Sequence, residues 1–358
     1  MWFHLHWLLP DFLPRVAHFG WMGVDLFFVL SGYLIGSQPL KAHQAGAGVG
    51  LWRFYRRRLY RILPAYLVVV ALYFLWPAWR EDPGISPLWE FLTFTENLFV
   101  NYDLNHAFSH VWSLCIEEQF YLVLPMIMLV MMRRPSVKRT AWLIAGLVGV
   151  GIAVRTYEFF HVLRSLGAED ASVKYIERIY YPTWCRMDGL LAGVSLALVR
   201  VFRPGWWDAM ARWGWAMLAG GLGLVAIALW LFDDRFASQT GAAEWGTFVG
   251  FPVLSVGLGL VMASSMSGRG WIRIPGAQWV ATLAYSLYLS HKAVVHVAEI
   301  YLPSLTAEHG VKAAVVCGVA CLVGAVVLHF GVERPFMVLR DRGRVKAVEE
   351  EMRLDPAV

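Results

Sequence analysis

The sequence predicts an all-α protein that crosses a membrane several times, as a polytopic helical bundle of about ten spans. Three observations favour this fold class. Of the 358 residues, 58% are apolar and only 16% are charged, whereas a soluble domain carries about 25% charged residues. Long apolar stretches recur along the chain, and basic residues gather in alternate links between them. Soluble, disordered and disulfide-stapled folds are therefore excluded.

The candidate spans are apolar stretches of about 17 residues or more, preceded by one shortened span at the N-terminus. They are predicted at 1–9, 20–37, 64–79, 110–132, 140–156, 187–202, 214–232, 247–265, 278–301 and 311–332. Basic links follow every second span, and such links face the cytoplasm. Both termini are therefore predicted to be cytoplasmic, with a transmembrane domain at 1–340 and a charged cytoplasmic tail at 341–358.

Charge and cysteine usage narrow the function classes further. The formal net charge is +5, but the basic residues lie between apolar stretches and form no single soluble face, which argues against nucleic-acid binding. His106 and His110 have the spacing of a zinc pair on a helix, yet no third ligand accompanies them, and we predict no metal. The cysteines all lie in apolar stretches and are interpreted as buried thiols: Cys115, Cys185, Cys317 and Cys321.

Ionisable residues within the predicted spans are functional candidates, because charges in the hydrocarbon are costly and usually face the bundle interior. The predicted orientation places His4, Asp25, Glu117 and His291 in the outer half of the membrane. A histidine accepts a proton near neutral pH, and a carboxylate can orient it. This layer therefore predicts general base catalysis. The alternatives are structural: a histidine that only bonds neighbouring helices, or an Asp25 that only caps its helix.

The first and fourth spans carry this prediction to individual residues. His4 and His6 differ by about 200° around a helix, so only one of them can face the bundle. Ser113, Glu117 and Tyr121 recur every four residues and form one stripe, which indicates an inward face.

The link after the second span is more basic than orientation requires. Arg53, Arg57 and Arg61 would line one helical face. Arginine forks match the geometry of phosphate groups, which favours a phosphate-bearing ligand. The alternative is an orientation signal that also contacts anionic lipid.

Three ordered segments closely resemble the signatures of acyltransferase family 3. They are GVDLFFVLSG at 23–32, RRLYRILP at 57–64 and HVWSLCIEEQFY at 110–121. Shorter matches follow in the family's order, namely RMDG, YSLYLSH and ERP at 186–189, 285–291 and 333–335. The resemblance covers about residues 1–340.

The resemblance implies an integral membrane enzyme that moves an acyl group, often acetyl, from acyl-coenzyme A to a hydroxyl of a carbohydrate. It assigns the family's first-span histidine to His4, with His6 as the other register, and its key carboxylate to Glu117. It links the donor to a basic motif formed here by Arg57, Arg58 and Arg61. The family also has an arginine upstream of this histidine, which this sequence does not contain, so we expect either a truncated chain or a misassigned start.

The resulting hypothesis is a two-sided enzyme that takes acetyl-coenzyme A from the cytoplasm and a carbohydrate acceptor from the opposite face. His4 would remove the acceptor proton, oriented by Asp25 or Glu117. We expect further substrate contacts from Ser113, Tyr121 and His291. A proton-coupled transporter and an inactive scaffold remain alternatives. The expected location is the inner or plasma membrane, with lipids as further partners.

Overall fold

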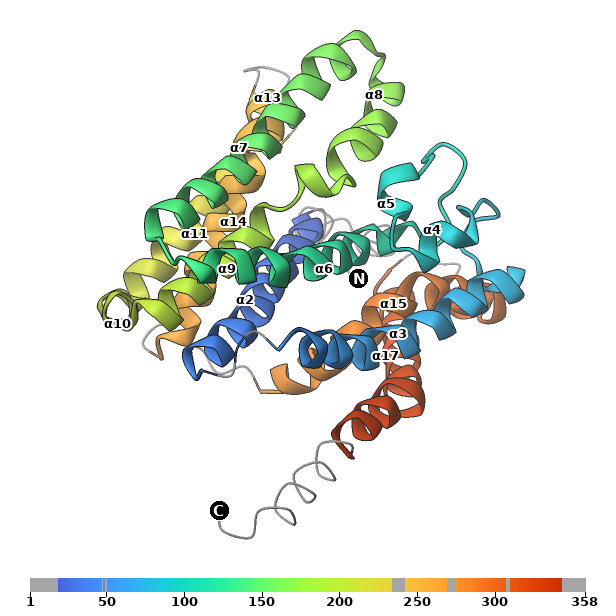
Figure 1. Cartoon of the computed structure of the whole chain (residues 1–358). Helices are drawn as coiled ribbons and strands as arrows, with labels where there is room; N and C mark the ends of the chain where they lie inside the picture. The colour runs from blue at the N-terminus through green and yellow to red at the C-terminus, as the bar shows by residue number, and fades with distance from the viewer. Residues whose placement is uncertain are drawn as a thin grey trace. The chain divides into compact units, whose positions relative to one another are not determined.

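The computed structural model describes residues 19–46, 48, 50–233, 242–268, 275–306 and 310–342. Across these residues every regular element is a helix (Figure 1). Within these described ranges, seven helices are long and apolar enough to cross a membrane: Phe19–Gln44, Leu51–Leu75, Ser109–Arg133, Val137–Ser165, Gly214–Leu231, Gly246–Met266 and Val311–Arg342. The predicted all-α, multi-pass membrane protein is thereby confirmed.

Two further predicted spans are helical but do not belong to these seven. The helix α9 (Asp188–Phe202) has 15 residues, about 22 Å of rise, which is shorter than a hydrocarbon core of about 30 Å. The helix α15 (Ala277–Tyr301) has 25 residues. The predicted span at 1–9 lies outside the described residues. The count of about ten spans and the cytoplasmic termini therefore stay predictions.

The helix α3 (Leu51–Leu75) begins before the span predicted at 64–79. The sequence analysis expected Arg53, Arg57 and Arg61 on one helical face of the link before this span, and Arg53 to Arg61 do lie on the first turns of α3, so this link is part of the helix. The physical reason is local propensity. No glycine or proline stands between Leu51 and Pro64, so the helix starts outside the apolar stretch.

The chain divides into two compact units. Of the described residues, those at 51–83 and from 275 onwards form the first unit, and those at 19–50 and 84–268 form the second. Each unit is described by itself below.

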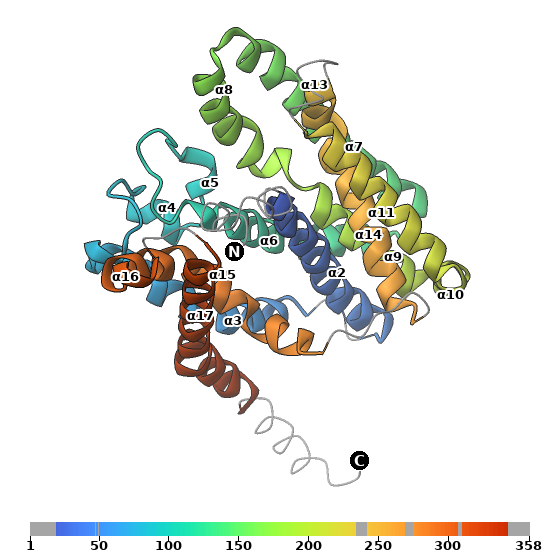
Figure 2. The same ribbon diagram turned by 180° about the vertical axis from the view of Figure 1, so that it is seen from behind.

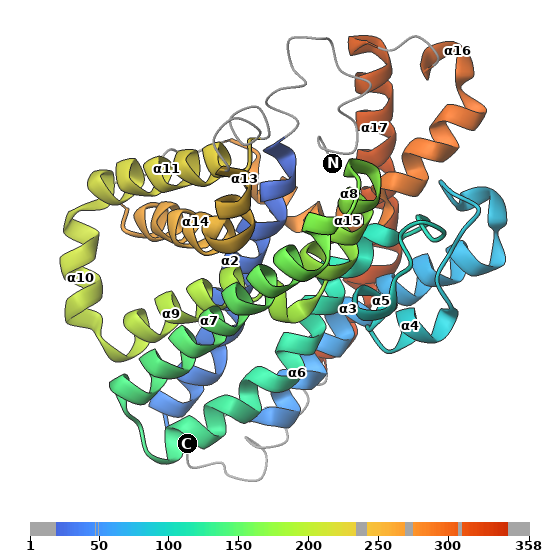
Figure 3. The ribbon, with the colours of Figure 1, turned by 90° about the horizontal axis from the view of Figure 1, so that it is seen from above.

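The second unit contains the longer helices α2 (Met22–Gln44), α6 (Trp112–Arg133), α7 (Val137–His161), α11 (Gly214–Leu231) and α14 (Phe251–Met266), together with α9. Its shorter helices include α4 (Leu88–Leu92), α5 (Glu96–Phe99), α8 (Ala168–Tyr175), α10 (Pro204–Arg212) and α13 (Ala242–Trp245). Figure 3 shows α11 beside α14. The pair α2 and α9 has the most extensive contact in the unit.

Glycines explain the close contact between α2 and α9. A Cβ atom on Gly32 would lie 2.1 Å from the carbonyl oxygen of Leu190, and one on Gly193 would lie 2.1 Å from that of Val29. No other residue type fits these positions without moving the backbone. Small residues allow such close packing between membrane helices, and here they bring the first turns of α2 and α9 together.

Polar side chains attach the segment between α4 and α6 to the rest of the second unit. Gln119 on α6 donates to the carbonyl oxygen of Phe94 at 2.7 Å and to Asn97 Oδ1 at 2.9 Å. The hydroxyl of Thr183 donates to Gln119 Oε1 at 2.6 Å. Phe94 has a left-handed backbone, with φ of 54°, and the bond from Gln119 satisfies the carbonyl of this unusual turn.

The first unit contains α3, α15, α16 (Pro303–Thr306) and α17 (Val311–Leu328), which continues into the π-helical turn η9 (His329–Glu333). Figure 2 shows α15 against α17. Their core includes Val295, Cys317 and Cys321. The hydroxyl of Tyr285 on α15 donates to the carbonyl oxygen of Ile62 on α3 at 2.8 Å. All four cysteines are free and buried, which confirms their interpretation as buried thiols.

Candidate active site

The first turns of α2 and α9 hold a buried ion pair. Arg186 precedes α9, and its Nη2 atom lies 3.1 Å from both carboxylate oxygens of Asp25 on α2. Both residues are 2% exposed. Asp25 is therefore part of a charge pair, and a role limited to capping α2 is wrong.

Aromatic rings surround the guanidinium of Arg186. Its central carbon lies 3.8 Å from the ring centre of Phe251, 4.6 Å from that of Tyr180 and 5.6 Å from that of Trp112. Ring faces attract cations most strongly where water is excluded. The cation is thus stabilised by one carboxylate and by several aromatic faces.

A second buried pair lies next to the first in the chain. Arg155 on α7 places Nη1 2.7 Å from Asp188 Oδ2 and donates from the same atom to the carbonyl oxygen of Cys185. Its Nη2 atom donates to the carbonyl oxygen of Phe248 at 3.3 Å. Arg155 is 0% exposed. The sequence analysis did not single out Arg155, although an arginine inside the predicted span 140–156 is itself a signal.

The predicted stripe on α6 is buried. Ser113, Glu117 and Tyr121 are 2%, 2% and 3% exposed, as an inward-facing stripe requires. The Tyr121 hydroxyl lies 2.7 Å from Ser31 Oγ on α2, so the stripe faces this helix. Trp112 on the same helix packs edge-to-face on Phe28 of α2, with ring centres 6.1 Å apart.

These contacts bring together the N-terminal ends of α2, α6 and α9 and the C-terminal end of α7. Successive spans are predicted to run in alternating directions, so α7 runs opposite to α2, α6 and α9. Its C-terminal end is therefore predicted on the same side as their N-terminal ends. The cluster lies at the end of the bundle that the basic links predict to face outward. It therefore combines four buried charges with the Glu117 stripe.

The arginines linked to the donor lie in the first unit, on α3. Arg57 and Arg58 are partly buried and Arg61 is exposed. Arg57 and Arg61 are four residues apart and share one face, while Arg58 is turned by about 100°. A helix can present such guanidinium groups to one anionic ligand.

His291 lies in the first unit as well. It is 3% exposed, and its Nδ1 atom is 2.9 Å from the carbonyl oxygen of Tyr288. The neighbouring Lys292 pairs with Glu81 at 3.4 Å, and Glu81 also accepts a 2.8 Å hydrogen bond from Tyr73. The predicted substrate contact of His291 stays a prediction.

The first unit also contains a buried polar group that the sequence analysis missed. Glu333 Oε2 accepts a 2.9 Å hydrogen bond from Ser286 Oγ and lies 2.9 Å from His329 Nδ1. All three residues are less than 5% exposed. His329 and Glu333 lie in the π-helical turn η9, and π-turns often mark functional sites. The available signal was the motif that begins at Glu333.

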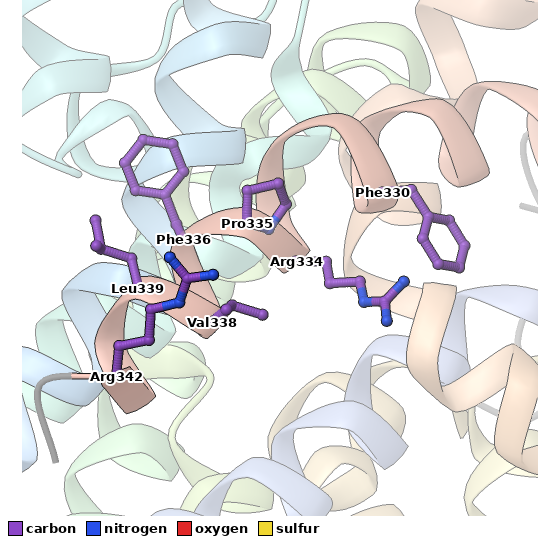
Figure 4. Close-up of a pocket in the computed structure, with 7 residues that line it drawn as sticks. All are labelled: Phe330, Arg334, Pro335, Phe336, Val338, Leu339 and Arg342. Atoms are coloured by element: carbon purple, nitrogen blue, oxygen red, sulfur yellow. The ribbon is translucent and has the colours of Figure 1, made fainter. Parts of the chain in front are cut away.

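An open surface hollow lies along the helical segment after α17. Arg334 in its wall lies over the ring of Phe330, 5.3 Å from the ring centre. Figure 4 shows the lining side chains, which are Phe330, Arg334, Pro335, Phe336, Val338, Leu339 and Arg342. None of these was predicted as a site residue.

The predicted histidine base and the predicted absence of a metal are not tested by these contacts. His4 and His6 are outside the described residues, so the partnership of His4 with Asp25 or Glu117 stays a prediction. Among the residues that the structure describes, no group of three histidine, cysteine or carboxylate side chains is arranged to hold a metal ion.

Comparison with known proteins decides the family. The family described as "acyltransferase domain" matches residues 1–330. The chain belongs to this acyltransferase family. The resemblance drawn from the three sequence segments is therefore confirmed.

Several curated proteins are similar to this family member. The peptidoglycan O-acetyltransferase OatA of Listeria monocytogenes is 27% identical over 297 residues, which cover 77% of this chain and 45% of the relative. A Staphylococcus aureus protein provisionally named an O-acetyltransferase is 26% identical over 79% of this chain and 47% of its own length. YrhL of Bacillus subtilis, provisionally named a peptidoglycan O-acetyltransferase, is 34% identical over 51% of this chain and 29% of its own.

The chain spans less than half of the length of these relatives. No solved structure matches it.

Proposed function

We propose that this acyltransferase family member is a membrane O-acetyltransferase that moves an acetyl group from acetyl-coenzyme A to a carbohydrate hydroxyl, with peptidoglycan as the acceptor. The observation that carries the proposal is the buried cluster of Asp25, Arg155, Arg186 and Asp188, in the same unit as the buried Glu117. Buried charges in a membrane protein mark functional sites by default, and this cluster lies in the part of the chain that the family match covers. The names of the relatives support acetyl transfer and the acceptor.

The chemistry proposed for the outer residues is general base catalysis. His4 removes the proton of the acceptor hydroxyl as its oxygen attacks the thioester carbon. Glu117 or Asp25 orients the imidazole and stabilises the imidazolium that forms. The burial of Glu117 supports this role, because a carboxylate acts most strongly on a neighbouring cation where water is excluded. Direct transfer to the acceptor is the simplest sequence of steps.

The donor is proposed to bind at α3. Coenzyme A carries several phosphate groups, and arginine binds phosphate through paired N–H donors. The first turns of α3 supply Arg57, Arg58 and Arg61, with Arg57 and Arg61 on one face. The positive-inside rule places these turns at the cytoplasmic side, so the proposed location is the inner or plasma membrane.

Acyl transfer by the purified full chain tests the proposal. The protein in detergent is mixed with acetyl-coenzyme A labelled in the acetyl group and with de-O-acetylated peptidoglycan fragments. We expect alkali-labile label on the glycan and release of free coenzyme A. Glu117→Gln serves as the inactive control. Unchanged acetyl-coenzyme A under conditions in which the protein remains folded would contradict the proposal.

The assignment of the base has its own test. We expect His4→Ala to abolish transfer and His6→Ala to preserve most of it, because these positions differ by about 200° around a helix. The opposite result would move the base to His6. Solute uptake by proteoliposomes without acyl transfer would instead support the transporter alternative, which the family match does not favour.

A further inference from the structure

Arg186 and Arg155 are both buried, but they differ in how their N–H groups are satisfied. Within the described residues, Nε and Nη1 of Arg186 have no hydrogen-bond partner, and its side chain is 0% exposed. Its side chain has one polar contact in the described ranges, with Asp25 through Nη2. Buried donors are normally paired, so Arg186 retains hydrogen-bonding capacity in a site closed to bulk water.

Arg155 provides the internal comparison. Its Nη1 and Nη2 atoms both donate to protein oxygens, and only Nε lacks a partner among the described residues. Asp188 accepts from Arg155 as Asp25 does from Arg186. The two pairs thus have the same charges and similar burial, yet of the two arginines only Arg186 has two nitrogen atoms without a partner in the part of the chain that the structure describes.

The charge of Arg186 is suited to an oxygen that becomes negative during a reaction. The carboxylate of Asp25 balances its positive charge, so a neutral ligand gains little binding free energy from the pair. A developing oxyanion gains more, because Phe251, Tyr180 and Trp112 exclude water around the guanidinium. Fixed donors in such a site stabilise the transition state more than the ground state.

The position of Arg186 matches the place where this charge would form. Its ring neighbour Trp112 is on α6, next to Ser113 and about one and a half helical turns from Glu117. Arg186 therefore lies at the same end of the second unit as the carboxylates proposed to act with the base.

From this geometry we infer that Arg186 is a catalytic residue that binds the thioester carbonyl oxygen and stabilises its oxyanion in the tetrahedral intermediate. The inference rests on the proposed acetyl transfer and adds the oxyanion-binding group. The acceptor oxygen bonds to the carbonyl carbon, and the carbonyl electron pair moves to the oxygen held by Nε or Nη1. The acceptor proton passes to the base. Collapse of the intermediate breaks the C–S bond, and the thiolate of coenzyme A takes the proton from the base.

The test compares Arg186→Lys with the matched control Arg155→Lys in the purified full chain. Acetyl-coenzyme A and fluoroacetyl-coenzyme A are the two donors. We expect Arg186→Lys to lower kcat for acetyl transfer about 100- to 1,000-fold, the usual effect of removing an oxyanion donor, with small changes in KM. Fluorine withdraws electrons and stabilises the oxyanion itself, so the loss with the fluoroacetyl donor should be clearly smaller. Arg155→Lys should lower the thermal midpoint and affect both donors equally.

The outcomes separate this inference from the proposed function. If the wild-type protein transfers no acetyl group, the proposed function is contradicted. Transfer by the wild type together with an unchanged rate in folded Arg186→Lys overturns only the inference, as does an equal loss for both donors. If Arg186→Lys does not fold, the double variant Asp25→Asn/Arg186→Gln removes both charges together. It is compared with Asp25→Asn alone, because Asp25 is itself proposed to orient the base, and the same two donors and the same criterion apply.

Discussion

At the scale of single residues, buried charges decide both the stability and the chemistry of the second unit. The guanidinium of Arg155 joins α7 to Asp188 at the start of α9 and to the backbone of Phe248 before α14. One side chain thus connects segments that are up to 93 residues apart in the sequence. Its loss leaves a buried carboxylate without a partner, and this is more costly than the loss of the whole pair.

This argument gives a stability prediction for Arg155. We expect Arg155→Met to lower the free energy of unfolding by about 3–5 kcal/mol, because Asp188 then remains buried and unpaired. The double variant Arg155→Met/Asp188→Leu should recover much of this loss. Thermal unfolding in detergent measures both variants. If the double variant is less stable than the single one, the argument from an unpaired buried charge is contradicted, and the pair stabilises the fold through its other contacts.

Glu90 gives a prediction about pH. It is 5% exposed on α4, outside the spans, and its Oε2 atom has no hydrogen-bond partner among the described residues. Burial raises the pKa of this carboxyl, and a hydrogen bond with Ser86 acts in the opposite direction. The folded state then holds its proton more tightly than the unfolded state, so this residue's contribution to stability falls as pH rises through the window between the two pKa values.

Glu90→Gln tests this sign. The variant should be close to the wild type in thermal midpoint at the acidic end of that window and more stable above it, because the amide never ionises. Glu169→Gln, the same substitution at the exposed start of α8, is the matched control. A difference between Glu90→Gln and wild type that does not change with pH would contradict the raised pKa.

At the scale of elements, the contact between α2 and α9 determines the distance between Asp25 and Arg186. This contact depends on Gly193, where a Cβ atom would also lie 2.5 Å from the backbone nitrogen of Tyr33. The surrounding atoms belong to the backbone, so no side-chain movement relieves the clash. A larger residue must separate the two helices, and the ion pair then lengthens.

We therefore expect Gly193→Ala to lower the stability of the protein by about 1–3 kcal/mol, as overpacking does, and to reduce acetyl transfer as well. Gly220→Ala on α11 is the control, since a methyl group added there would meet no atom within 4 Å, and it should be neutral or slightly stabilising. Thermal unfolding and the acetyl-transfer assay measure both. Full activity in Gly193→Ala would show that the ion pair tolerates a wider separation.

At the scale of the whole molecule, apolar stretches predicted most helices because a spanning segment must satisfy its own backbone in lipid. The stripe of Ser113, Glu117 and Tyr121 followed from the four-residue spacing alone. The start of α3 at Leu51 did not follow from the apolar pattern, because helix propensity outside the lipid decides where that helix begins. The π-helical turns, such as η9, also carry no sequence pattern of their own.

The charge pairs were beyond sequence reasoning for another reason. Asp25 and Arg186 are 161 residues apart, and their contact depends on the glycine packing of α2 on α9. Likewise, the four-residue spacing of His329 and Glu333 could have predicted their contact. The hydrogen bond from Ser286 to Glu333 could not be predicted in this way, because it depends on the packing of α15 on α17. Local patterns thus identify which residues face inward, and tertiary packing decides which of them meet.

The orientation of the protein in the membrane is the last prediction, and its native cysteines make it simple to test. All four are buried, so an impermeant maleimide should label only cysteines that are introduced. Trp52 at the start of α3 and Leu104 before α6 are 73% and 67% exposed. Because basic segments remain on the cytoplasmic side, we expect intact cells to label Leu104→Cys but not Trp52→Cys, and permeabilised cells to label both. Equal labelling of the two variants in intact cells would place the arginines of α3 and the start of α6 on one side, and acetyl-coenzyme A would then have no access to α3 from the cytoplasm.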